Sequence, residues 1–263
     1  MMILLSQEKW SMAFFGKRII LTDSLRLEIS PQPRRKMLMS GKAIAILVVL
    51  GALLCLALPT NSHAADNTAL NADILKIALD WEHIKFQEAD KDLQEKQMAA
   101  LADRAAALVQ QYQNRPEAMI WHGIIISEQA SMASENGSPF KALGFAKRAR
   151  AILEPLATTN PAILDAGAPA SLGVLYYRVP GFPVGFGDKA KARQLLQEAV
   201  KYAPDGLDAN YFYGDFLYEQ KEYPAAQQIF KHALSLPPHP ERPIWDKSRR
   251  LVIQEDLAKM PSN

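Results

Sequence analysis

The chain has 263 residues, of which 49% are apolar, 22% charged and 8% aromatic, so it can bury a sizeable core and is not disordered. Residues 65–263 carry 22 basic and 25 acidic side chains, and this mildly acidic balance argues against a nucleic-acid-binding groove, which needs concentrated positive charge. The only cysteine is Cys55, so the rest of the chain has no disulfide, thiol nucleophile or cysteine metal ligand.

Residues 37–64 have the parts of a secretory signal peptide. A basic stretch ending at Lys42 is followed by the uncharged residues 43–58, and small residues flank the position before Ala64. We therefore expect export to the periplasm, with cleavage after Ala64. The apolar run is short for a bilayer, which needs about 20 helical residues, and an uncleaved inner-membrane anchor is the alternative.

Residues 1–36 precede this signal peptide and include an apolar-aromatic cluster and a turn-rich end. We interpret them as the product of an upstream start codon chosen in error, or as a disordered or cytoplasmic N-terminal extension. The remaining residues, 65–263, are expected to form one helical domain that is large enough to be stable without disulfides.

The apolar side chains after residue 69 recur every three or four positions, and no segment combines a period of two with hairpin signals. The pattern predicts helices only. Aspartates that precede a helix can accept the free N–H groups of its first turn, so we expect Asp188 and Asp208 to be N-caps. The predicted helices span residues 70–90, 93–113, 117–133, 140–157, 169–178, 189–203, 209–220, 224–236 and 244–259.

The clearest repeat unit lies in residues 208–238. A glycine in its first helix, Gly214, allows the second helix to approach closely, and Phe230 fills the space between the two helices. The small residues at the helix crossing and the proline that ends the unit are Ala226, Ala233 and Pro238.

This unit resembles the tetratricopeptide repeat, although Asn210 and Tyr213 replace the usual tryptophan and leucine. A second unit begins around Gly173, and two degenerate helix pairs precede it. The resemblance implies an all-α fold, a short right-handed solenoid of three or four helix pairs closed by the helix at 244–259. It also implies that partners bind on the concave face.

The second unit differs from the first by seven extra residues between its helices, within the sequence VPGFPVGFG. This insert is similar to a Pro/Gly-rich turn in the periplasmic T-component of certain TRAP transporters, and that resemblance implies a helical periplasmic partner of a transporter. The insert residues of interest are Pro180, Gly181, Phe182, Phe186 and Gly187.

No catalytic or metal-binding motif is visible. None of the histidines pairs with another histidine or cysteine at helical spacing, and there is no Gly-x-Ser-x-Gly elbow. Glycines precede Asp188, but no strand comes before them and the aspartate would repel a phosphate. We therefore expect a protein that is not an enzyme and that uses no metal and no cofactor.

The first helix of each pair is expected to line the concave face, and spacing from the three first-helix glycines selects ten residues there. These are Ile120, Ile124, Ser127, Glu128, Val174, Tyr177, Arg178, Tyr211, Asp215 and Tyr218. Tyrosine and arginine are favoured at interfaces, so we expect this strip to bind an extended peptide or another envelope protein. The predicted function is a non-catalytic adaptor or scaffold in the bacterial envelope, touching the membrane only through an uncleaved signal.

The alternative function is a periplasmic small-ligand-binding protein that serves a transporter, with the aromatic insert covering an apolar pocket. A ligand binder would carry a bound metabolite through purification, whereas an adaptor would yield a protein partner on cross-linking.

Overall fold

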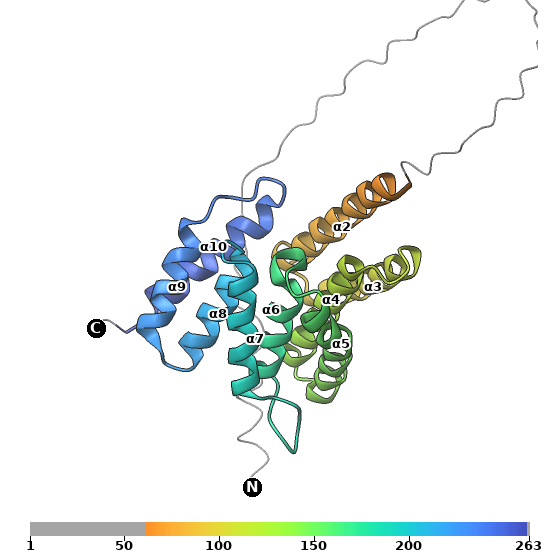
Figure 1. Ribbon diagram of the computed structural model, residues 1–263. Coiled ribbons are helices and arrows are strands. Elements are labelled where there is room, and N and C mark those ends of the chain that lie inside the picture. Colours follow the sequence, from red (N-terminus) through yellow and green to blue (C-terminus); the bar gives the residue numbers. More distant parts are fainter. Residues whose placement is uncertain (1–61, 262–263) are drawn as a thin grey trace, which may run out of the picture.

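The computed structural model describes residues 62–261, which form nine helices and no strand (Figure 1). The helices are α2 (Ser62–Phe86), α3 (Lys91–Gln111), α4 (Pro116–Glu135), α5 (Pro139–Thr159), α6 (Ile163–Arg178), α7 (Lys189–Tyr202), α8 (Leu207–Glu219), α9 (Tyr223–Ser235) and α10 (Pro243–Ala258). Every predicted helix is confirmed, although α2 begins eight residues and α6 six residues before the predicted start; the other ends shift by at most four residues. The predicted extension 1–36 and the signal peptide up to residue 61 lie outside the described residues.

The helices stack as consecutive hairpins, α2 with α3, α4 with α5, α6 with α7, and α8 with α9 (Figure 1). The first helices of neighbouring pairs also touch, because α4 contacts both α2 and α6, and α6 contacts α8. The last helix, α10, packs against α8 and α9 and also against α2 at the other end of the domain. The predicted all-α repeat solenoid is therefore confirmed, and it curls until its first and last helices meet.

Glycines in the first helices fix how closely the pairs approach. A Cβ atom added to Gly123 would lie 2.6 Å from the side chain of Leu153. At Gly173 it would lie 2.7 Å from Leu196, and at Gly214 it would lie 2.5 Å from the ring of Phe230. These distances confirm that the three glycines are equivalent contact points of three successive helix pairs.

Replacing Gly214 with alanine is expected to lower the free energy of unfolding by about 1–3 kcal/mol, because the added methyl group overlaps the fully buried ring of Phe230. Gly144 in α5 is the matched control, since nothing lies within 4 Å of a Cβ there. Gly144→Ala should stabilise by up to about 1 kcal/mol through helix propensity. Urea unfolding of both variants measures the difference, and losses of equal size would contradict this packing argument.

The two predicted N-caps have different outcomes. The carboxylate of Asp188 accepts hydrogen bonds of 2.9 and 3.0 Å from two backbone N–H groups in the first turn of α7, which confirms that cap. The prediction for Asp208 is wrong, because α8 begins two residues before the predicted start, at Leu207, so Gly206 is the N-cap and Asp208 lies inside the first turn. The carboxylate of Asp208 instead accepts hydrogen bonds from Trp245 and Arg249 of α10.

Helix α6 opens with an unusual backbone turn. Leu164, Asp165 and Ala166 have φ angles of 52°, 51° and 59°, in the left-handed region that residues with a side chain seldom adopt. The regular part of α6 begins after this turn, which agrees with the predicted helix start at residue 169. The turn presents Leu164 and Asp165 to the inner side of the solenoid.

Candidate functional site

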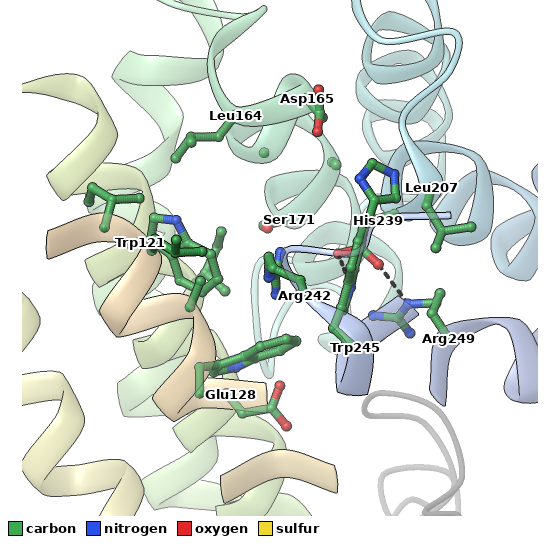
Figure 2. Close-up of a pocket in the computed structure, with 18 of the residues that line it drawn as sticks. Trp121, Glu128, Leu164, Asp165, Ser171, Leu207, His239, Arg242, Trp245 and Arg249 are labelled. Atoms are coloured by element: carbon green, nitrogen blue, oxygen red, sulfur yellow. Dashed lines mark hydrogen bonds and ion pairs between the residues drawn. The ribbon is translucent and has the colours of Figure 1, made fainter. Parts of the chain in front are cut away.

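A cavity of about 310 Å³ lies on the inner side of the solenoid. Its walls come from the first helix of every pair, α2, α4, α6 and α8, and from α10 together with the segment before it. Three tryptophans line it, one each from α2, α4 and α10, and we call it the tryptophan cavity (Figure 2). They are Trp81, Trp121 and Trp245.

Arg242 lies between Trp121 and Trp245 (Figure 2), and it is also close to Trp81. Its guanidinium carbon lies 4.3 Å from the ring centre of Trp245, 5.3 Å from that of Trp121 and 5.7 Å from that of Trp81. Cations are attracted to the faces of aromatic rings, and the attraction grows when water is excluded. The tryptophans therefore hold the arginine side chain in place without neutralising its charge.

The first and the last helix meet beside the cavity. Glu82 of α2 is buried, and its Oε2 atom accepts a hydrogen bond of 3.0 Å from the backbone N–H of Trp245, in the first turn of α10. Glu82 thus acts as a cap for α10 from across the solenoid. Burial raises the pKa of Glu82, and this effect outweighs the hydrogen bond from Trp245 and the attraction by Arg242.

Most charged groups in the wall are paired at close range. The Oδ1 atom of Asp208 lies 2.6 Å from Nε of Arg249, and Glu128 lies 2.5 Å from the ammonium group of Lys85. Burial alone would lower the pKa of Arg249, but Asp208 together with Tyr211 and Glu128 outweighs burial, so the pKa is raised.

Arg242 is the exception. Its nearest paired carboxylate oxygen belongs to Glu82, 3.8 Å from Nε, which is too far for a hydrogen bond. The Nε and Nη2 atoms of Arg242 are buried without a hydrogen-bond partner. Burial lowers the pKa of Arg242, and attraction by Asp208 and Glu82 does not offset it. The cavity therefore contains a cation that its surroundings compensate poorly.

Three of the ten residues expected on the concave face do line the tryptophan cavity, namely Ile124, Ser127 and Glu128 of α4. Ile120, Val174 and Tyr211 are instead buried in the core, at most 1% exposed, so they offer no open surface. The expectation of an open strip fails at these positions because the first helices pack directly against one another.

The remaining residues of the strip are largely satisfied by each other. Asp215 accepts hydrogen bonds from the hydroxyl group of Tyr177 and from Nη2 of Arg178, and Arg178 and Asp215 are both buried. Tyr218 is partly buried, and its ring lies 5.7 Å from that of Tyr223. These side chains join α6 to α8, and their role in partner binding stays a prediction.

The insert does not cover the cavity. Phe186 packs against Tyr176, with ring centres 5.5 Å apart, and lies 4.7 Å from the guanidinium carbon of Arg150 on α5. Gly187 donates its N–H to the carbonyl of Pro180, which closes the loop on itself. Phe182 and Gly181 are exposed, and none of the five insert residues lines the cavity. The insert therefore does not cover the tryptophan cavity, because the loop turns toward α5, where Phe186 helps to line a separate hollow.

Sequence reasoning missed the residues that define the cavity, Trp81, Arg242, Trp245 and Arg249. One signal was available: the three tryptophans after residue 65 lie in helices that begin a pair or close the solenoid. Within residues 62–261, no group of three or more histidine, cysteine, aspartate or glutamate side chains is placed to hold a metal ion.

Residues 184–242 match the tetratricopeptide repeat family. This part of the chain is tetratricopeptide-repeat-like. The match runs from the end of the insert through α7, α8 and α9 and ends at Arg242. Tetratricopeptide repeats are in general non-catalytic modules for protein–protein interaction, and the solenoid fits that class. The similarity to the T-component of TRAP transporters stays a prediction.

Proposed function

We propose that the protein is an exported, non-catalytic adaptor of the bacterial envelope, which binds a protein partner at the inner side of its tetratricopeptide-like solenoid. The observation that carries this proposal is the stack of helix pairs with an inner hollow lined by every first helix. Leu75 at the cavity and Leu79 one turn later are exposed on α2, and they offer a partner an apolar contact.

The proposed export to the periplasm rests on residues 37–64, which have the parts of a signal peptide. Among residues 62–261, no helix is long and apolar enough to span a membrane. Cleavage after Ala64 would remove only the first residues of α2 and leave the described side chains in place.

Site-specific photo-cross-linking in the envelope fraction tests the adaptor function. A photoreactive phenylalanine analogue at Leu75 is expected to give one discrete cross-linked product, because this side chain borders the cavity. Leu93 on α3 is a matched control, since it is similarly exposed but lies outside the cavity. N-terminal sequencing of the same sample should begin at Ala65.

Equal cross-linking at both leucines, or none at Leu75, would contradict partner binding at the inner side. A mature chain that begins before residue 37 would contradict cleavage of a signal peptide.

The tryptophan cavity also favours a second candidate function, the binding of a small molecule. Its volume of about 310 Å³ is at the lower end of the range typical of small-molecule sites, so a protein partner could place only a side chain or a chain end inside it. Its lining is mostly apolar with a few polar groups, which is the usual composition of such sites.

A further inference from the structure

One cation at the tryptophan cavity, Arg242, has only a distant ion-pair partner, because its Nε atom lies 3.8 Å from Glu82. Arg249 forms a hydrogen-bonded ion pair with Asp208, and Lys85 forms one with Glu128. The other two carboxylates in the lining, Asp165 and Glu241, are exposed, so water screens them. Arg242 alone faces the cavity without a carboxylate at hydrogen-bond distance.

The setting of Arg242 restricts what can approach it. The rings of Trp121 and Trp245 lie 5.3 and 4.3 Å from its guanidinium carbon, and its Nε and Nη2 atoms are buried without a hydrogen-bond partner. Arginine pairs in its own plane with planar oxygen groups such as carboxylates. Beside it, Ile74 and Ile124 supply apolar surface.

We propose that the tryptophan cavity binds a small organic acid, whose carboxylate pairs with Arg242 and whose aromatic or aliphatic body packs against the tryptophans and the apolar side chains of α2 and α4. This inference rests on the second candidate function. Because Glu82 already lies 3.8 Å from Arg242, the site has room for one further negative charge, which favours a monoanion over a phosphate dianion. The lowered pKa of Arg242 agrees with this, because an added anion would compensate the burial.

Titration of the full-length chain with two compounds of the same shape tests the proposal. One is 3-phenylpropionate and the other is its neutral amide, 3-phenylpropanamide. Calorimetry gives the affinities, and tryptophan fluorescence reports the location, because three of the four tryptophans line the cavity. We expect the acid to bind at least about tenfold more tightly than the amide, as a charge-assisted pair does.

Substitutions locate the anion. Arg242→Gln should remove the preference for the acid while the amide still binds, and Arg242→Lys should restore part of it. Arg104→Gln is the control for net charge, because Arg104 lies on the surface of α3 and pairs with Asp80 there. The comparison of acid with amide on the unaltered chain holds even if the Arg242 variants fold poorly.

Equal affinity for acid and amide would overturn the proposal and leave small-molecule binding standing. Absence of binding by both at millimolar concentration would overturn both. A short peptide ending in phenylalanine, compared with its C-terminal amide, tests whether the bound carboxylate belongs to a small acid or to the C-terminus of a protein. If the free peptide bound more tightly than 3-phenylpropionate, the ligand would be the end of a protein partner and the small-acid proposal would be wrong.

Discussion

Replacing Asp215 with alanine is expected to lower the free energy of unfolding by about 3–5 kcal/mol, because it leaves the buried guanidinium of Arg178 without its main counter-charge. The same carboxylate accepts a hydrogen bond from the hydroxyl group of Tyr177, and this hydroxyl group would lose its partner as well. Because this cluster joins α6 to α8, the loss should appear in the cooperative unfolding of the whole solenoid. Urea denaturation with circular dichroism measures it.

A surface ion pair provides the comparison. Asp80→Ala removes the partner of Arg104, but both side chains are substantially exposed, so solvent screens their attraction. We expect this variant to unfold almost as the unaltered chain does. Similar losses in Asp80→Ala and Asp215→Ala would show that burial does not set the strength of these pairs.

Replacing Glu82 with alanine is expected to cost about 2–3 kcal/mol, because the first turn of α10 loses a buried hydrogen-bond acceptor and Arg242 loses its nearest carboxylate. The variant should also weaken the contact between α2 and α10. Hydrogen exchange would detect this as faster exchange in α10, while α6 and α7 exchange at unchanged rates. Uniformly faster exchange throughout the domain would contradict a local role for Glu82.

The raised pKa of Glu82 also predicts how the free energy of unfolding depends on pH. Burial raises its pKa in the folded state above the ordinary value of 4.5, so folding favours the protonated form. The stabilisation that protonated Glu82 contributes is fully present below pH 4.5, the ordinary pKa. It is lost as the pH rises through the higher pKa that Glu82 has in the folded protein. Glu82→Gln keeps the shape and cannot ionise, so its stability should fall less over that range. Parallel pH curves for the two proteins would refute the raised pKa.

The sequence predicted the helices and their pairing because both depend on local spacing. Gly173 and Gly214 are the corresponding glycines of two repeat units, although seven extra residues separate Gly173 from its partner Leu196, and the structure places both against a large side chain of the second helix. The cap at Asp188 was equally predictable, since it depends only on the next three residues. Local rules failed at Asp208, where donors from a distant helix compete for the carboxylate.

The tryptophan cavity could not be predicted in this way. It depends on how far the solenoid curls, which is the sum of small rotations between successive pairs. That curl brings Glu82 to Trp245, 163 positions later in the chain. The same curl packs Tyr211 inside the core, although its spacing is that of a concave-face residue. The left-handed turn at Leu164 carries no sequence signal, since no glycine occupies it.

The meeting of α2 with α10 has a practical consequence for anyone who shortens this protein. A fragment cut to the boundaries of the repeat match, residues 184–242, would retain Arg242 and none of the tryptophans around it. Such a fragment would keep the residues of the repeat match and lose most of the lining of the tryptophan cavity. Expression trials should therefore keep both ends of the helical domain together.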